Sequence, residues 1–158
     1  GVERFAQDAG EAGLDGMIVP DLPTEEAGAF KGLCENHGIY LIPLLAPTST
    51  DRRIALACKD ARGFIYCVSL TGVTGARRDL GSGLSQLVGR IRRHTDLPVL
   101  VGFGVSRREH MESISQFADG AVVGSALLDA IDKSPSEQVL QTAREFVQGL
   151  RSSGDQSV

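Results

Sequence analysis

Five apolar runs rich in β-branched residues alternate with segments of helical spacing, and this alternation constrains the fold more than any other feature. The runs span residues 17–22, 40–45, 64–70, 98–105 and 120–123. They are nearly continuous rather than alternating with polar residues, which is the pattern of parallel strands buried on both faces. The sequence therefore predicts about five strand–helix units of an α/β fold.

The segments between the runs carry signals of helix starts and ends. One helix is expected to start near Thr24, before two glutamates, and to stop at Gly38; Ser106 and Glu109 have the spacing of a capping box for another. A further helix should begin just after Ser125. Residues 2–13, 50–59 and 84–94 are predicted as three more helices.

The last helix shows the clearest start and the clearest apolar face. Ser134, Pro135 and Glu137 mark its beginning. Apolar residues then recur at helical spacing, with Leu140 beside them: Val139, Ala143, Phe146, Val147 and Leu150. We expect this helix to pack on the outside of the sheet. Residues 152–158 are polar and are predicted to form a flexible tail.

Five such units are too few for a closed barrel of parallel strands. An eight-stranded (β/α)8 barrel takes about 250 residues, whereas this chain has 158. Five strands cannot close at the shear of that barrel, and an open sheet would leave two unpaired edges. We therefore expect residues 1–151 to form a partial TIM barrel, either the C-terminal part of a longer barrel or a chain that pairs with another.

Glycine-bearing stretches stand where the strand patterns end. Gly102-Phe103-Gly104 and Gly124-Ser125 follow two strands directly, and residues 72–75 follow an earlier one. Glycine lets backbone N–H groups approach an anion closely, and a helix that starts after Ser125 adds the positive end of its dipole. The carboxyl ends of the strands are where such barrels gather their ligands. The sequence therefore predicts a pocket for a phosphate monoester.

The stretch from Thr71 to Ser82 lengthens the connection between the third and fourth strands. It carries three glycines and two arginines. Long loops on a regular scaffold are functional or decorate the surface. We interpret residues 71–82 as a lid with glycine hinges, with surface decoration as the alternative.

Composition narrows the range of partners. The net charge is −4 and the basic residues are scattered, so neither a nucleic acid nor an anionic membrane is expected as a partner. Cys34, Cys58 and Cys67 are odd in number and lie in apolar or helical contexts, which favours reduced thiols and a reducing compartment. We expect a cytoplasmic protein, or one of the plastid stroma if the source is a plant.

Several stretches together resemble the tryptophan synthase alpha subunit family. They include Val19 to Pro23, Leu44 to Ser49, Tyr66 to Ser69 running into Gly72-Val73-Thr74-Gly75, Gly102 to Val105, and Gly124 to Ala126. Their order and spacing are those of strands four to eight of that family's barrel, and the resemblance covers essentially the whole chain. It implies cleavage of indole-3-glycerol phosphate to indole and glyceraldehyde 3-phosphate.

The resemblance also implies a role for individual residues. The phosphate cradle would consist of Gly75, Gly104, Gly124 and Ser125. The walls around the indole ring would be Tyr66, Phe103, Ile18 and Leu44, for which a place in the barrel core is the alternative. Thr74 resembles the family's lid threonine. Asp21 resembles an aspartate near the lid and the partner subunit, and its alternative role is that of a capping or solvated carboxylate.

The reaction requires carboxylates that this chain is not expected to contain. Indole must be protonated at a ring carbon while a base takes the ring N–H, and a second carboxylate takes the proton of the glycerol hydroxyl. In the family a glutamate and an aspartate do this work, and both would lie upstream of Gly1. We therefore expect a lyase whose catalytic residues lie outside this chain, with no metal, no cofactor and the tryptophan synthase beta subunit as partner.

Two other interpretations stay open. The chain is either part of another phosphate-binding barrel enzyme or a noncatalytic fragment that only binds phosphate or a partner. A Ser-centred nucleophile elbow is absent, because Gly124-Ser125-Ala126 lacks the flanking pattern.

Overall fold

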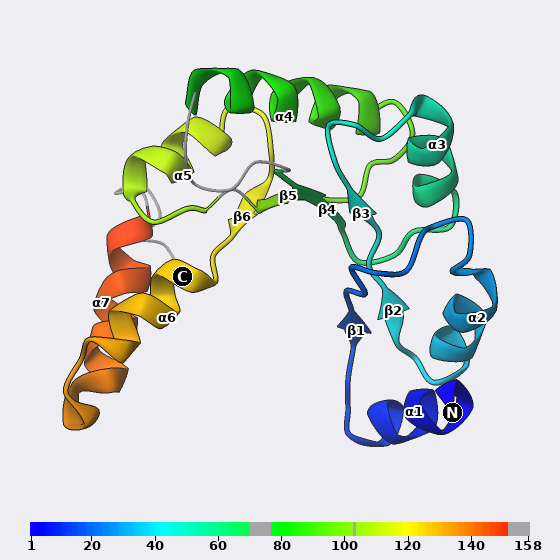
Figure 1. Ribbon diagram of the computed structural model, residues 1–158, viewed down its shortest axis with the longest axis horizontal. Coiled ribbons are helices and arrows are strands. Elements are labelled where there is room, and N and C mark those ends of the chain that lie inside the picture. The colour runs from blue at the N-terminus through cyan, green and yellow to red at the C-terminus, as the bar shows by residue number, and fades with distance from the viewer. Residues whose placement is uncertain (70–76, 103, 152–158) are drawn as a thin grey trace.

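The protein forms an open arch of alternating strands and helices, shown in Figure 1 as a computed structural model that describes residues 1–69, 77–102 and 104–151. The elements in chain order are α1 Val2–Glu11, β1 Gly16–Met17, α2 Gly28–Asn36, β2 Tyr40–Leu41, β3 Leu44–Leu45, α3 Asp51–Lys59, β4 Ile65–Val68, α4 Arg77–Ile91, β5 Val99–Gly102, α5 Arg108–Ile114, β6 Gly120–Val122, α6 Ser125–Asp132, a 3-10 helix Ser136–Gln138 and α7 Val139–Leu150. The predicted alternation of strand and helix is confirmed.

All strands are parallel and lie in chain order. One sheet has the order β3-β4-β5-β6, and the other consists of β1 and β2. The stretch from Tyr40 to Leu45 joins the two sheets, because the Ile42 amide donates to the Met17 carbonyl at 2.8 Å and the Tyr66 amide donates to the Pro43 carbonyl at 3.0 Å. β2 and β3 are thus two parts of one strand that Pro43 interrupts. The result is a five-stranded part of a (β/α)8 barrel.

The core lies between the four-stranded sheet and helices α3, α4 and α5, which cover its convex side (Figure 1). In β4 and β5, Ile65, Cys67, Val99 and Val101 are fully buried, while the residues that alternate with them are only half-buried. The expectation of strands buried on both faces is therefore wrong for the described residues. The concave face of a barrel is covered by side chains of strands on the opposite side, and an arch of five strands does not supply them.

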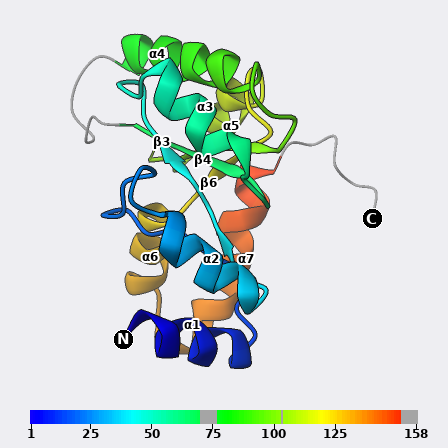
Figure 2. The ribbon, with the colours of Figure 1, turned by 90° about the vertical axis from the view of Figure 1, so that its right-hand side faces the viewer.

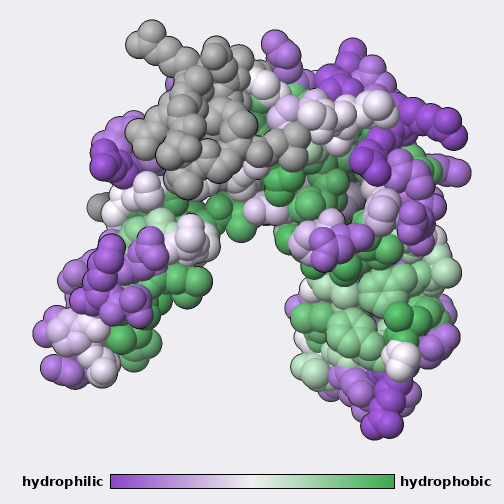
Figure 3. All heavy atoms as spheres, in the orientation of Figure 1, coloured by the Kyte–Doolittle hydropathy of each residue, from purple (hydrophilic) through white to green (hydrophobic). Residues whose placement is uncertain are grey.

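Two arms extend from the arch, away from α4. One arm is formed by α1 and α2 and the other by α6 and α7, as both Figure 1 and Figure 2 show. Figure 3 shows apolar side chains along the inner flanks of both arms. Large apolar residues of the arms are exposed, among them Leu140 at 86% and Leu128 at 65%. On α1, Ala6 is buried, whereas Val2 and Phe5 are both 52% exposed, since α1 packs mainly on α2.

Several helix boundaries differ from the predicted ones. α2 starts at Gly28 rather than near Thr24, and α4 already starts at Arg77, so that the second half of the predicted lid segment is helical. The expected capping box is absent, since Arg107 precedes α5 and the Ser106 amide donates to His110 Nδ1 at 3.3 Å. Thr50 does cap α3, because its hydroxyl accepts from the Arg53 amide at 3.3 Å.

Side-chain bonds tie the amino ends of β5 and β6 together. The Asp119 carboxylate accepts a hydrogen bond of 2.6 Å from the Val99 amide and forms an ion pair with Arg92. The Asp119 amide in turn donates to the Val99 carbonyl at 3.0 Å, and Arg92 donates to the Leu97 carbonyl at 3.2 Å. The amino ends of β5 and β6 are thus held together by Arg92, which follows α4, and by Asp119, which follows α5.

Candidate active site

Backbone groups dominate the carboxyl ends of β5 and β6. The two strands pair with Gly102 opposite Val122, so the segments that follow them leave the sheet side by side. Gly104 has φ +58°, and a Cβ added at Gly104 or at Gly124 would meet nothing within 4 Å. The structure therefore places three of the predicted cradle residues, Gly104, Gly124 and Ser125, on adjacent turns that are exposed to solvent.

The start of α6 presents free donors at this edge. Gly124 is its N-cap residue and no side chain caps the helix. The Leu127 and Leu128 amides both donate to the Gly124 carbonyl, at 3.0 and 3.1 Å. The amides of Ser125 and Ala126 come before any possible acceptor inside the helix. This edge can therefore receive an anion on N–H groups and on the positive end of the α6 dipole.

Tyr66 lies on the concave face and leans against β5. A Cβ added to Gly102 would come within 2.8 Å of Tyr66 Cζ and closer still to the hydroxyl oxygen. Only a glycine at this position leaves room for the ring. The first glycine of Gly102-Phe103-Gly104 thus makes room for the Tyr66 ring, whereas the sequence pattern suggested contact with phosphate.

The other predicted wall residues lie at different distances from this edge. Leu44 stands opposite Tyr66 in the register of β3 and β4, so both occupy the same face of the sheet. Ile18 follows β1 and is 38% exposed. Asp21 is exposed in the segment after β1, away from the turns of β5 and β6 along the strand order. Thr74, Gly75 and Phe103 lie outside the described residues.

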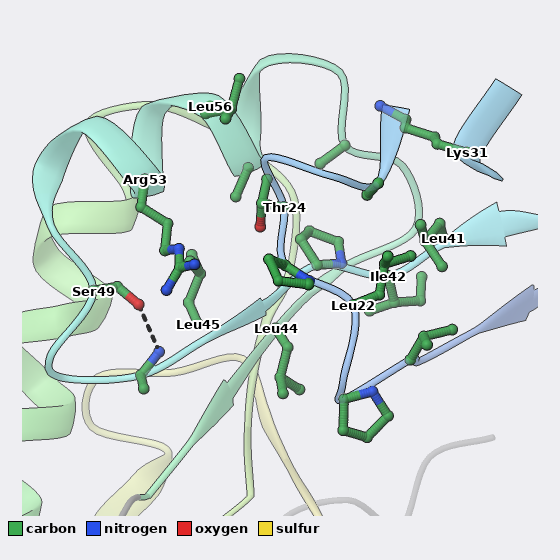
Figure 4. A pocket seen from close by; sticks show the side chains of 18 of the residues that line it. Leu22, Thr24, Lys31, Leu41, Ile42, Leu44, Leu45, Ser49, Arg53 and Leu56 are labelled. Carbon is green, nitrogen blue, oxygen red and sulfur yellow. Dashed lines mark hydrogen bonds between the residues drawn. The ribbon is translucent and has the colours of Figure 1, made fainter. Parts of the chain in front are cut away.

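A cavity of about 520 Å³ opens beside Leu44, between the segment after β1 and helices α2 and α3. Figure 4 shows its walls, with Leu22 and Thr24 on one side and Arg53 and Leu56 on another. Most of the lining side chains are apolar, and Asp21 also lines it. Its size falls within the range of small-molecule pockets.

Ion pairs and a buried hydroxyl frame this cavity. Ser49 is 7% exposed, and its hydroxyl accepts from the Ala46 amide at 3.0 Å. Hydrogen bonds from Arg53 lower the pKa of Glu25, and those from Arg90 lower the pKa of Asp51. Sequence reasoning missed Arg53 and Arg90, because their partners lie 28 and 39 residues away and no local pattern links them.

The cysteines do not belong to a reactive site. All three are buried and free. Burial, followed by the neighbouring Cys58, raises the pKa of Cys67 to about 12. A thiol with such a pKa is a poor nucleophile at neutral pH.

The described part of the chain offers neither a metal-binding group of side chains nor a membrane-spanning helix. Within residues 1–69, 77–102 and 104–151, no three His, Cys, Asp or Glu side chains are grouped so that they could hold a metal ion. In the same ranges no helix has the length and apolar character needed to cross a membrane.

Comparisons with known proteins point to one family. A sequence model described as tryptophan synthase alpha chain matches residues 1–154. The tryptophan synthase alpha chain of Roseiflexus sp. (strain RS-1) is 49% identical over 151 residues, which cover 96% of this chain and 58% of that protein.

Solved structures agree with the sequence comparison. A structure of the tryptophan synthase α2β2 complex from Pyrococcus furiosus matches with a TM-score of 0.83 and 37% identity, over 95% of this chain and 60% of that one. Tryptophan synthase subunit alpha from Campylobacter jejuni matches with a TM-score of 0.80 and 31% identity, over 92% and 59%. The chain thus spans a little over half the length of these relatives.

Proposed function

This chain belongs to the tryptophan synthase alpha chain family, and we propose that it supplies the phosphate-binding half of a lyase. The parent protein would cleave indole-3-glycerol phosphate to indole and glyceraldehyde 3-phosphate. The observation that supports this most strongly is the pair of adjacent turns at Gly104 and Gly124, where an anion can meet backbone amides without any basic side chain.

The strength of such a cradle fits a metabolite phosphate. Hydrogen bonds to a charged group contribute about 1.5–3 kcal/mol each. A few of them, from Gly104, Gly124 and Ser125 with Gly75 from the segment after β4, add up to the range of a millimolar to micromolar ligand, about −4 to −8 kcal/mol. We assign these four residues to the phosphate.

The indole ring would occupy the concave face next to this edge. Tyr66 and Leu44 stand on neighbouring strands of that face, and Gly102 lets the Tyr66 ring lie close to β5. With Phe103 and Ile18 they would enclose the ring by apolar contact. Thr74 would close over the substrate from the segment between β4 and α4.

The proton transfers would fall to carboxylates outside this chain. One must protonate the indole ring carbon, and another must accept the proton of the glycerol hydroxyl as the carbon–carbon bond breaks and the aldehyde forms. We propose that these carboxylates belong to a segment of the parent protein that corresponds to the unmatched part of the relatives. No cofactor enters this scheme, and the 158-residue chain alone would be inactive.

We also propose a partner that takes up the released indole. The similar Pyrococcus furiosus structure is of an α2β2 complex, and the tryptophan synthase beta chain is the corresponding partner here. Asp21 and the Ala46–Ser49 turn, which line the cavity between α2 and α3, would face that partner or communicate with the lid.

The activity is tested with the full-length protein that contains this chain. Purified protein, with its beta chain added, should release indole and glyceraldehyde 3-phosphate from indole-3-glycerol phosphate, whereas residues 1–158 alone should not. Cleavage by residues 1–158 at the full rate would contradict the assignment of the catalytic carboxylates. Binding of other phosphate esters without cleavage of this substrate would contradict the proposed function.

A further inference from the structure

The segment after β1 and helix α4 are both bound to the first turn of α3. Arg53 forms two hydrogen bonds with the Glu25 carboxylate, at 3.1 and 2.9 Å, and so holds the segment after β1. From α4, Arg90 donates to Asp51 at 2.8 Å and to the Ser49 carbonyl at 2.6 Å. Asp51 and Arg53 both belong to the first turn of α3.

This turn is itself well ordered by local bonds. Thr50 caps it, accepting from the Arg53 amide at 3.3 Å. Ser49, just before the cap, is buried, and its amide donates to the Ala46 carbonyl at 2.8 Å. The chain Glu25–Arg53–Asp51–Arg90 therefore links three segments, which are the segment after β1, the first turn of α3 and helix α4.

Other ion pairs differ in kind from these two. Arg4–Asp8, Lys31–Glu35 and Arg108–Glu112 each lie within one helix at i,i+4 spacing. Arg53–Glu25, Arg90–Asp51 and Arg92–Asp119 instead join separate parts of the chain, and the first two of these pairs meet on the first turn of α3. Bidentate geometry adds orientation as well as attraction.

The segments held in this way are the ones that face the cavity. The segment 19–24 and the turn 44–49 form two of its walls, and Arg53 points between them (Figure 4). On a further side, Lys31 Nζ of α2 donates to the Asp60 carbonyl at 2.6 Å. Loss of either arginine would release one wall while the fold around the core remains.

We propose that Arg53 and Arg90 are positioning residues, which act through the first turn of α3 to hold the Asp21 segment and the Ala46–Ser49 turn as one unit. Exposed ion pairs add little to global stability, so the unit determines local order rather than folding. One consequence of this role rests on the proposed function, namely that the unit presents the surface for the beta chain.

The direct test is hydrogen exchange in the full-length protein. The Leu22 and Glu26 amides, which donate to the Val19 and Pro23 carbonyls, report on the segment after β1. Arg53→Met and Arg90→Met should each speed their exchange about threefold or more, although Arg90 bonds to Asp51 and Ser49 and not to that segment. Arg4→Met breaks a pair within α1 and should leave both amides unchanged. Unchanged exchange in Arg90→Met would overturn the proposal.

A charge swap separates the ion pair from mere packing. Glu25→Arg combined with Arg53→Glu should bring the exchange of Leu22 back to the native rate, and failure to do so would contradict a positioning role for Arg53. When the full-length protein is titrated with the beta chain, Arg90→Met should weaken the affinity for the beta chain about threefold, while the affinity for inorganic phosphate stays the same. A protein that binds no beta chain at all fails the proposed function, and the exchange result still decides the positioning claim.

Discussion

The two ends of the parallel strands are built differently. At the amino ends, Asp119 bonds the Val99 amide and pairs with Arg92, so side chains lock one strand to the next. At the carboxyl ends, Gly104 and Gly124 offer backbone with open space around it. Barrels of this kind keep stability at one end and ligand chemistry at the other. We therefore expect the two ends of the strands to respond separately to mutation.

The largest effect is expected at the amino end, from Asp119→Ala. It leaves the Val99 amide, whose residue is fully buried, without its acceptor. An unsatisfied buried donor costs about 1–3 kcal/mol. Urea unfolding of the full-length protein should show this loss in the free energy of unfolding, while affinity for inorganic phosphate stays the same. A parallel loss of phosphate affinity would break the separation of the two ends.

Gly102→Ala should act mainly on binding. The new Cβ collides with the Tyr66 ring and pushes it off β5 into the space assigned to the indole. We expect the affinity for an indole-bearing substrate analogue to fall about tenfold, equal to about 1.4 kcal/mol, by calorimetry. Gly89→Ala on α4 is the matched control, because a Cβ there meets nothing within 4 Å. Equal affinities of the two variants would contradict the placement of Tyr66.

Gly104→Ala tests the cradle by strain alone. Its φ of +58° is the left-handed region, and a Cβ there has open space, so the substitution changes backbone energy and not contacts. That conformation costs an alanine about 1–2 kcal/mol. Relaxation of the turn should lower the affinity for glycerol 3-phosphate about fivefold at this cost. Full affinity would show that the Gly104 amide does not take part.

The smallest effect concerns pH. The Val99 amide, and after it Arg92, lowers the pKa of Asp119 in the folded protein. Because the folded pKa lies below the unfolded one, the contribution to stability is present above about pH 4 and is lost as the pH falls through the folded pKa. Unfolding of native protein and Asp119→Asn, measured between pH 6 and about 3, should show a steeper loss for the native protein. The same dependence of stability on pH in both proteins would contradict this role of the Asp119 carboxylate.

The sequence predicted the fold well where the signal was local. The five strand–helix units, the helix after Thr50 and the start of α6 near Ser125 are confirmed, because β-branched runs and helix-start signals act within a few positions. The boundaries of α2 and α4 were wrong. α4 extends upstream through Gly81 and Gly83. Burial of Leu84, Leu87 and Ile91 stabilises the helix and outweighs the low helix propensity of the two glycines.

Long-range relations could not be read from the sequence. Burial of only one strand face depends on what covers the concave side, and the Arg53–Glu25 pair depends on how the turn before α2 meets α3. The adjacency of Gly104 and Gly124 could be predicted, since both follow strands that are neighbours in a parallel barrel. The contact of Tyr66 with Gly102 could not, because it depends on the direction in which one ring leans.

The most direct measurement is a titration of the ¹⁵N-labelled full-length protein with glycerol 3-phosphate, following the backbone amides by NMR. The account predicts that the amides of Gly104, Gly124 and Ser125 shift together with one dissociation constant and become protected from exchange, while the Val99 amide at the other end of the strand does not change. If these three amides stay unperturbed while the ligand binds, backbone recognition of phosphate at the ends of β5 and β6 is contradicted.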